Sequence, residues 1–184
     1  MQKLRNEELN RKSVEEFRKA GKIPVLLVLD HLRSLNNVGS IFRTADAFLV
    51  EKIYLCGITA CPPHREIQKT ALGATESVIW EYRRETPPLI EQLKEEGYHI
   101  ISLEQVQGSV SLEKYQFVFG KKYALVLGHE VKGVSQEVIN LSHECLEIPQ
   151  FGTKHSFNVA VSAGIVLWDY FLKTSKSNKK GGQK

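Results

Sequence analysis

The sequence is poor in features that mark several other classes of protein. Its three cysteines, Cys56, Cys61 and Cys145, are an odd number without framework spacing, so we expect free thiols in a reducing compartment. The longest mostly apolar stretch, residues 159–168, has half the roughly 20 residues that a bilayer span requires. The opening MQKLRNEELNRK contains no apolar signal core. We therefore expect a cytoplasmic protein, neither secreted nor inserted in a membrane.

Several catalytic motifs are missing as well. The sequence has neither the GxGxxG loop of dinucleotide-binding folds nor the GxxxxGK[ST] phosphate loop. His64 follows Cys61 by three residues, and His143 precedes Cys145 by two. Neither spacing forms a zinc-binding pattern, so the sequence predicts no metal site.

The composition is that of an ordinary globular domain. The chain has 184 residues, 42% of them hydrophobic and 25% charged, which fits one domain whose core needs no disulfide or metal. The net charge of +4 is unevenly placed: residues 1–22 carry seven basic and four acidic side chains, and residues 174–184 carry four lysines. Basic ends are one way to hold a polyanion such as nucleic acid, although solubility is the simpler explanation of the charge alone.

Apolar strands alternate with helical patterns along the chain. The predicted strands are short and mostly apolar, and they cover residues 25–30, 52–56, 77–82, 98–103, 122–128 and 145–149. Helical patterns cover residues 38–48, 64–73, 87–97, 135–142 and 156–174. Because such strands cannot face water, we expect an α/β fold with a mostly parallel sheet and helices on both faces.

The same patterns divide the chain into three segments. Residues 1–22 are predicted to form an N-terminal helical arm, and residues 23–173 a single α/β domain. Residues 174–184, TSKSNKKGGQK, are too polar to pack, so we expect a disordered basic tail.

Three polar loops follow predicted strands, and in open α/β sheets ligands bind beyond the carboxyl ends of strands. The first contains Asn37 and leads to Arg43, the second is LGHEVKG with Glu130, and the third is IPQFGTKHSFN before the last helix. Together the loops supply a guanidinium, a carboxylate, hydroxyl and amide groups, and several glycines. The lack of a second acidic side chain argues against glycoside hydrolysis.

At these loops the chain resembles a known family. The segments NVGSIFRTADAF, LVLGHEVKG and IPQFGTKHSFNVAVSAG are similar, in order and spacing, to the three motifs of the SpoU (TrmH-like) branch of the SPOUT RNA methyltransferases. The resemblance implies methyl transfer from S-adenosylmethionine to a ribose 2′-hydroxyl of tRNA or rRNA. It also implies a homodimer and a C-terminal deep trefoil knot, which is too rare to be predicted from hydrophobic periodicity.

The resemblance assigns three catalytic residues. Arg43 matches the family's catalytic arginine; Asn37 would position it, unless Asn37 only caps a helix, and Glu130 would hold the arginine or a ribose hydroxyl. Since a guanidinium is a poor base, we expect Arg43 to orient the hydroxyl and a neighbouring phosphate and to stabilise the developing alkoxide. Whether a substrate phosphate or a perturbed arginine takes the proton is left open.

The remaining site residues divide between substrate and cofactor. Ser156 and Asn158 would bind the ribose and phosphate of the target nucleotide, or cap the last helix. Cofactor contacts, largely through the main chain, would fall on Leu127, Gly128, Ile148, Gly152 and Phe157. Gly152 and Gly133 would allow tight turns.

The chain departs from the family pattern at three positions. His129, Phe157 and Ala160 stand where asparagine, leucine and serine are usual. Phe157 is still expected to form an apolar wall around the adenine, whereas the effect of His129 is left open.

Two other functions remain as alternatives on the same fold. A non-catalytic RNA-binding or assembly module would need loss of Arg43 or of the cofactor loop, and neither is lost. A base-directed methyltransferase generally lacks the Asn-x5-Arg arrangement of Asn37 and Arg43. RNA phosphates would contact a set of basic side chains together with the terminal arms: Arg33, Arg65, Lys132 and Lys154. The target RNA and nucleotide do not follow from the sequence.

Overall fold

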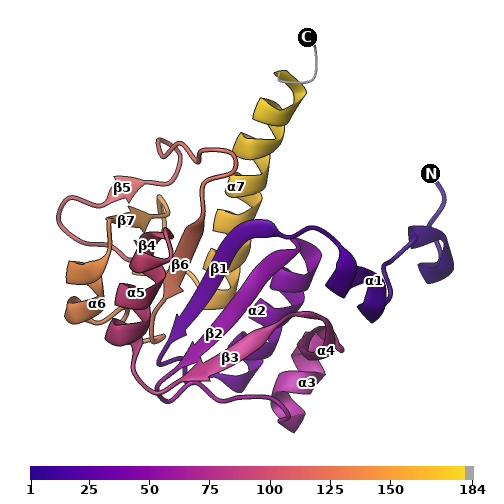
Figure 1. Ribbon diagram of the computed structural model, residues 1–184, viewed down its shortest axis with the longest axis horizontal. Helices are drawn as coiled ribbons and strands as arrows, with labels where there is room; N and C mark the ends of the chain where they lie inside the picture. Colours follow the sequence, from indigo (N-terminus) through magenta and orange to yellow (C-terminus); the bar gives the residue numbers. More distant parts are fainter. Residues whose placement is uncertain (181–184) are drawn as a thin grey trace.

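A single parallel sheet runs through the molecule (Figure 1). The computed structural model describes residues 1–180, without the side chains of residues 6, 7 and 176–180. Seven strands in this part of the chain pair in parallel, in the order β3-β2-β1-β6-β4-β7-β5. They are β1 (Ile23–Asp30), β2 (Val50–Cys56), β3 (Trp80–Arg83), β4 (His99–Leu103), β5 (Val110–Ser111), β6 (Tyr123–Leu127) and β7 (Glu144–Glu147). The predicted parallel sheet is confirmed, and the short β5 is an addition.

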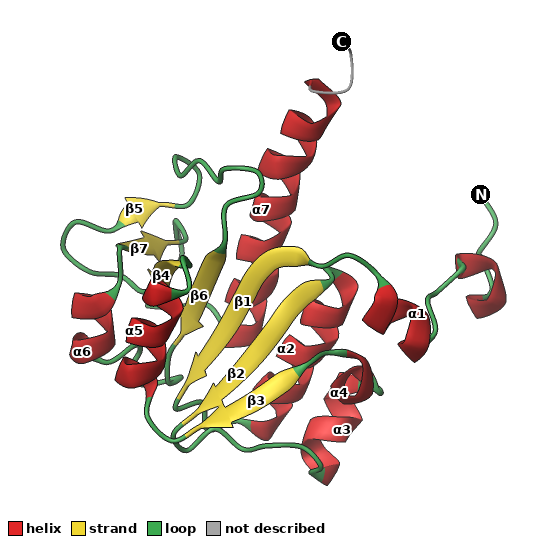
Figure 2. Cartoon of the chain, viewed as in Figure 1, coloured by secondary structure: helices red, strands yellow, loops and turns green. Residues whose placement is uncertain are grey.

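Helices cover both faces of this sheet, as predicted (Figure 2). On one side lie α2 (Leu35–Ala47), α3 (Arg65–Ala71), α4 (Ala74–Ser77) and α7 (Val159–Lys180), and on the other α5 (Thr86–Glu95) and α6 (Gln136–Leu141). Alternate residues of β1 belong to the two cores: Leu27 packs in the α2 and α7 core, and Leu26 and Val28 in the α5 and α6 core. Burial on both sides explains why β1 is continuously apolar.

Helix α2, which carries Asn37 and Arg43, is fixed by its cap and by a close contact. The Ser34 hydroxyl accepts a hydrogen bond from the Asn37 N–H at 3.3 Å and begins α2. One turn later, α3 approaches so closely that a Cβ on Gly39 would lie 2.1 Å from Thr70 Oγ1 and 2.3 Å from the Ile67 carbonyl oxygen. Only glycine therefore fits at residue 39.

The N-terminal segment packs on the domain. A 3₁₀ helix, η1 (Asn6–Leu9), ends at Asn10 with a left-handed φ of 46°, and α1 (Val14–Lys19) follows it. Phe17 on α1 is only 4% exposed, and Arg18 Nη2 donates to the Glu76 carbonyl at 2.7 Å. The predicted arm is therefore two short helices, with the second anchored to α4.

Several predicted boundaries are wrong. Helix α2 begins at Leu35 and not at Val38, so Asn37 of the first predicted loop lies in a helix. Residues 74–77 are helical, so β3 begins at Trp80 and not at Ser77. The expected disordered tail from Thr174 is helical to Lys180, and residues 181–184 lie outside the described part of the chain. Thr174 is buried and donates to the Tyr170 carbonyl. The polar residues after it extend a helix that is already formed, which avoids the cost of starting a new one.

The strand order determines where a site can form. Strands β4, β6 and β7 are neighbours or next neighbours, and their carboxyl ends meet at one edge.

No helix among residues 1–180 is long and apolar enough to cross a bilayer. The C-terminal trefoil knot stays a prediction, because strand order alone does not define threading.

Candidate active site

A cavity of about 540 Å³ opens at the carboxyl ends of β4, β6 and β7. Parallel sheets collect ligands at this edge. The predicted site residues that line the cavity are Leu127, Gly128, Glu130, Ile148, Ser156, Phe157 and Asn158. The structure therefore brings the second and third predicted loops together around one space.

The carboxylate of Glu130 joins the second loop to the first. It accepts hydrogen bonds from the backbone N–H groups of Arg33 and Ser34, both at 2.9 Å, and from Asn37 Nδ2 at 3.0 Å. Burial alone would raise the pKa of Glu130, but these donors outweigh it and hold the pKa below its usual value. At neutral pH the Glu130 carboxylate is therefore ionised, and its hydrogen bonds hold the second loop against the first.

Asn37 continues this link to the third loop. Its Oδ1 accepts a hydrogen bond from Asn158 Nδ2 at 3.0 Å, across 121 positions of sequence. Asn158 Oδ1 accepts in turn from the Ala160 N–H at 2.9 Å at the start of α7. Asn37 is therefore not the helix cap, a role that Ser34 fills, whereas Asn158 both caps α7 and holds Asn37.

The turn after β6 is compact and needs two glycines. A Cβ on Gly128 would lie 2.2 Å from the Val134 nitrogen and 2.3 Å from the Gly133 carbonyl carbon. Gly133 has a φ of +68°, which confirms the tight turn expected there. The missing side chain of Gly128 thus makes room for the backbone of residues 133 and 134, and Gly128 itself lines the cavity with main-chain atoms.

His129 closes the same turn. Its Nδ1 accepts hydrogen bonds from the N–H groups of Val131 at 3.0 Å and Lys132 at 3.3 Å. An asparagine side chain makes the same kind of bond to backbone N–H groups two residues ahead. His129 therefore makes a type of turn hydrogen bond that an asparagine could also make.

Three predicted site residues do not line the cavity of their own chain: Asn37, Arg43 and Gly152. Asn37 is tied to the lining by its hydrogen bonds with Glu130 and Asn158. Arg43 is exposed on α2, and none of the described residues hydrogen-bonds or ion-pairs with its guanidinium. Gly152 lies outside the lining, has open space where a Cβ would stand and has no positive φ. The expectation that Gly152 permits a tight turn is wrong, since other residues would fit there.

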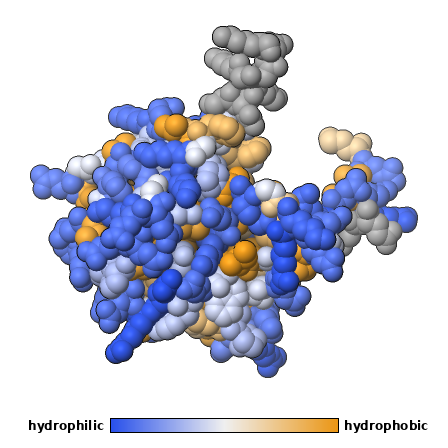
Figure 3. All heavy atoms as spheres, viewed as in Figure 1, coloured by the Kyte–Doolittle hydropathy of each residue, from blue (hydrophilic) through white to orange (hydrophobic). Residues whose placement is uncertain are grey.

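An apolar strip lies on α7 close to the helix that carries Arg43. Val161 and Trp168 are 50% and 52% exposed, and Phe171 is 47% exposed. Trp168 packs edge-on against Phe48, just beyond the end of α2, with ring centroids 6.5 Å apart. Figure 3 shows apolar atoms gathered where α7 leaves the body of the molecule, on an otherwise largely hydrophilic face.

Sequence reasoning missed a further segment of the site, the exit of β4. Leu103, Glu104 and Gln105 all line the cavity. Glu147 lines it as well, so the expectation that the site lacks a second acidic residue beside Glu130 is wrong. The available signal was positional: β4 is a predicted strand, and it ends in the polar pair Glu104–Gln105. Its place between β6 and β7, which the sequence does not reveal, puts that pair beside the second and third predicted loops.

The donor set favours an organic ligand. Among residues 1–180, no group of three or more histidine, cysteine, aspartate or glutamate side chains is arranged to hold a metal ion. The cavity instead combines apolar walls from Leu127, Ile148 and Phe157 with the main chain of Gly128 and many polar residues. Apolar surface beside hydrogen-bonding groups suits a small organic molecule or cofactor.

The fold is similar to those of several solved structures. The Aquifex aeolicus TrmH/SpoU tRNA modifying enzyme matches with a TM-score of 0.79 at 22% identity, covering 90% of this chain and 84% of that one. The AdoMet-bound rRNA methyltransferase of Sinorhizobium meliloti matches with a TM-score of 0.75 at 26% identity, covering 85% of this chain and 59% of that one.

Sequence comparison agrees with the structural likeness. The chain is 32% identical over 157 residues to the 23S rRNA (guanosine-2′-O-)-methyltransferase RlmB of Neisseria meningitidis, covering 85% of this chain and 62% of that protein. Across the first three curated relatives the chain spans 9%, 51% and 62% of their lengths. Residues 24–168 match the model of the SpoU rRNA Methylase family. The chain therefore belongs to the SpoU rRNA methylase family.

Proposed function

We propose that the protein is an S-adenosylmethionine-dependent RNA methyltransferase that acts on a ribose 2′-hydroxyl of tRNA or rRNA. The observation that carries the proposal is the hydrogen-bonded chain from Glu130 through Asn37 to Asn158. It joins three loops far apart in sequence at the edge of one cavity, in a member of the SpoU family. The named relatives act on tRNA or rRNA.

The cavity suits S-adenosylmethionine in size and in chemistry. Its volume of about 540 Å³ lies within the range of ordinary cofactor sites. Gly128, which has no side chain, lines the cavity with main-chain atoms, and such groups could pair with an adenine edge. Three carboxylates, those of Glu104, Glu130 and Glu147, line the cavity and favour a ligand that carries a sulfonium and an ammonium. When bound, the cofactor supplies an electrophilic methyl group.

The third loop would receive the target nucleotide. Ser156 and Asn158 precede α7 directly, and both line the cavity. Asn158 already accepts from the first N–H groups of α7, but the positive end of the helix dipole still favours a phosphate nearby. Ser156 would then bind the ribose, and Asn158 would hold the loop in place through its bond to Asn37.

Arg43 would enter the site of a second copy of the chain. It is exposed and lies outside its own cavity, and the apolar strip of Val161, Trp168 and Phe171 offers a surface for a homodimer. In the partner's site the guanidinium would orient the ribose hydroxyl and a neighbouring phosphate and stabilise the developing alkoxide.

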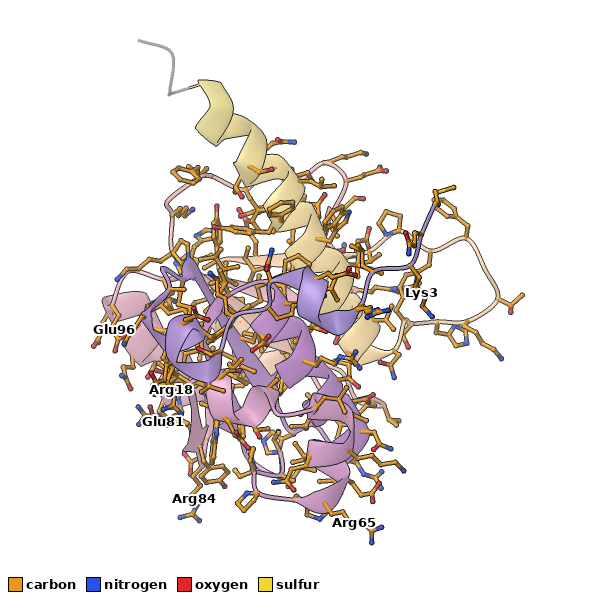
Figure 4. The ribbon with its side chains drawn as sticks, turned by 90° about the vertical axis from the view of Figure 1, so that its right-hand side faces the viewer. Lys3, Arg18, Arg65, Glu81, Arg84 and Glu96 are labelled. Atoms are coloured by element: carbon orange, nitrogen blue, oxygen red, sulfur yellow. The ribbon has the colours of Figure 1, made fainter. Side chains whose placement is uncertain are left out.

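Basic side chains near the cavity and on the outer helices would contact RNA phosphates. Lys132 and Lys154 belong to the second and third loops and are exposed, and Arg33 directly precedes the Ser34 cap of α2. Arg65 points away from the body at the start of α3 (Figure 4). Binding through such contacts weakens steeply with added salt. RNA as the substrate also favours a cytoplasmic location.

The proposal is tested by incubating the protein with methyl-labelled S-adenosylmethionine and RNA, then digesting the RNA to nucleosides. Label on 2′-O-methylribose is the expected result. Arg43→Ala should abolish transfer, whereas Arg84→Ala, which removes another exposed arginine beyond β3, should not. Label on a base would indicate base methylation, and absence of label an RNA-binding module.

A further inference from the structure

Glu104 stands at the exit of β4 and reaches the turn that follows β6. Its Oε2 accepts a hydrogen bond from the Val134 N–H at 2.8 Å, across 30 positions of sequence. Its Oε1 accepts from the Gln105 N–H at 3.1 Å, and its own N–H donates to the Leu146 carbonyl at 3.1 Å. Glu104 is thus fixed to β7 by its backbone and to the turn by its side chain.

The turn and the carboxylate fit against each other. A Cβ on Gly133 would lie 2.0 Å from Glu104 Oε2. The carboxylate therefore occupies space that a side chain at residue 133 would fill. Val134, the next residue, is only 4% exposed, and its N–H has little access to water. Without Glu104 this donor would be left buried and unpaired, which is costly.

The neighbouring Gln105 extends the same attachment to the third loop. Its Nε2 donates to the His155 carbonyl at a long 3.4 Å. The β4 exit therefore contacts both loops that carry the predicted cofactor residues. Neither contact involves Glu130, Asn37 or Asn158, so the attachment is separate from the hydrogen-bonded chain described above.

We propose that Glu104 is a positioning residue that holds the 128–134 turn in the conformation that receives the cofactor. The inference rests on the proposed function and extends it to a residue outside the three predicted loops. A carboxylate suits the role because a hydrogen bond to a charged acceptor is stronger than one to a neutral acceptor. With the turn fixed before binding, the cofactor does not have to order it.

The test has two measurements on the full chain. Hydrogen exchange in the free protein reports whether the Val134 amide is held, and calorimetry with S-adenosylhomocysteine reports whether the cavity is formed. Glu104→Ala should speed exchange at Val134 by about 10- to 100-fold, the factor for losing a hydrogen bond to a charged group. It should weaken S-adenosylhomocysteine binding by a comparable factor while leaving RNA affinity near the original value.

Two further variants separate positioning from general damage. Glu104→Gln keeps one oxygen for the Val134 N–H and should restore most of the affinity and protection. Glu113→Ala removes an exposed carboxylate from the same connection between β4 and β6 and should change neither measurement.

Contrary outcomes point to different failures. Unchanged exchange at Val134 and unchanged affinity in Glu104→Ala would overturn the role of Glu104 while leaving the proposed function intact. A parent protein that binds no S-adenosylhomocysteine would overturn the proposed function, and hydrogen exchange would still decide whether Glu104 holds the turn.

Discussion

The clearest perturbation of the site is removal of the Glu130 carboxylate. Three N–H donors, from Arg33, Ser34 and Asn37, converge on it. Hydrogen bonds to a charged group contribute about 1.5–3 kcal/mol each when buried, but Glu130 is only half-buried, and water can reach part of the vacated space. We therefore expect Glu130→Ala to lower the free energy of unfolding by about 2–3 kcal/mol in total.

Glu130→Gln should destabilise the fold less than Glu130→Ala. The amide keeps one oxygen but turns an NH₂ group toward a backbone donor, so we expect a loss of about 1–2 kcal/mol. Urea unfolding of both variants beside Glu113→Ala, which removes an exposed carboxylate, measures these values. Unfolding free energies within about 0.5 kcal/mol of the parent for both variants would refute the idea that Glu130 fastens the loops.

The same residue predicts a pH dependence. Because the folded-state pKa of Glu130 is lowered, its ionised form stabilises the fold above the unfolded-state pKa. This contribution is lost as the pH falls through the lower, folded-state value. The stability gap between the parent and Glu130→Gln should therefore be present at neutral pH and shrink in acid. A gap that grows on acidification would contradict the assignment.

Two further predictions concern the core. Gly39→Ala should lower the free energy of unfolding, measured in urea titrations, by about 1–3 kcal/mol, because the new Cβ would lie 2.1 Å from Thr70 Oγ1. Gly164→Ala, whose Cβ would have its nearest contact at 3.9 Å, should be tolerated. Burial raises the pKa of Cys56 to about 12, so mass spectrometry after alkylation at pH 8 should show Cys56 modified only once urea unfolds the chain; rapid modification of the native protein would disprove this.

The fold was predictable because its signals are local. Continuously apolar strands such as β1 must be buried on both faces, and the alternation with helices then leaves a parallel sheet as the natural arrangement. Element ends were less certain: residues 74–77 form α4 and shorten β3, and α7 continues through a polar segment. The position of α4 and the end of α7 both depend on how each helix packs against the rest of the domain, which a local sequence pattern does not encode.

The site was predictable in its parts but not in its connections. Resemblance named Asn37, Glu130 and Asn158 separately, yet their side-chain hydrogen bonds join positions 93 and 121 residues apart. Glu104 was missed because only the strand order places β4 beside the second and third loops. For Arg43 the sequence could not reveal that the side chain lies outside the cavity of its own chain.

A complementation experiment tests the central claim most directly. Arg43→Ala keeps the loops intact, and Asn158→Ala keeps the arginine, so each variant alone should transfer no methyl groups to RNA. Differently tagged and coexpressed, they should recover about a quarter of the parent activity, since half of randomly formed dimers are mixed and each holds one intact site. Mixed dimers that stay as inactive as the separate variants would contradict a site built from the three loops of one chain and Arg43 of another.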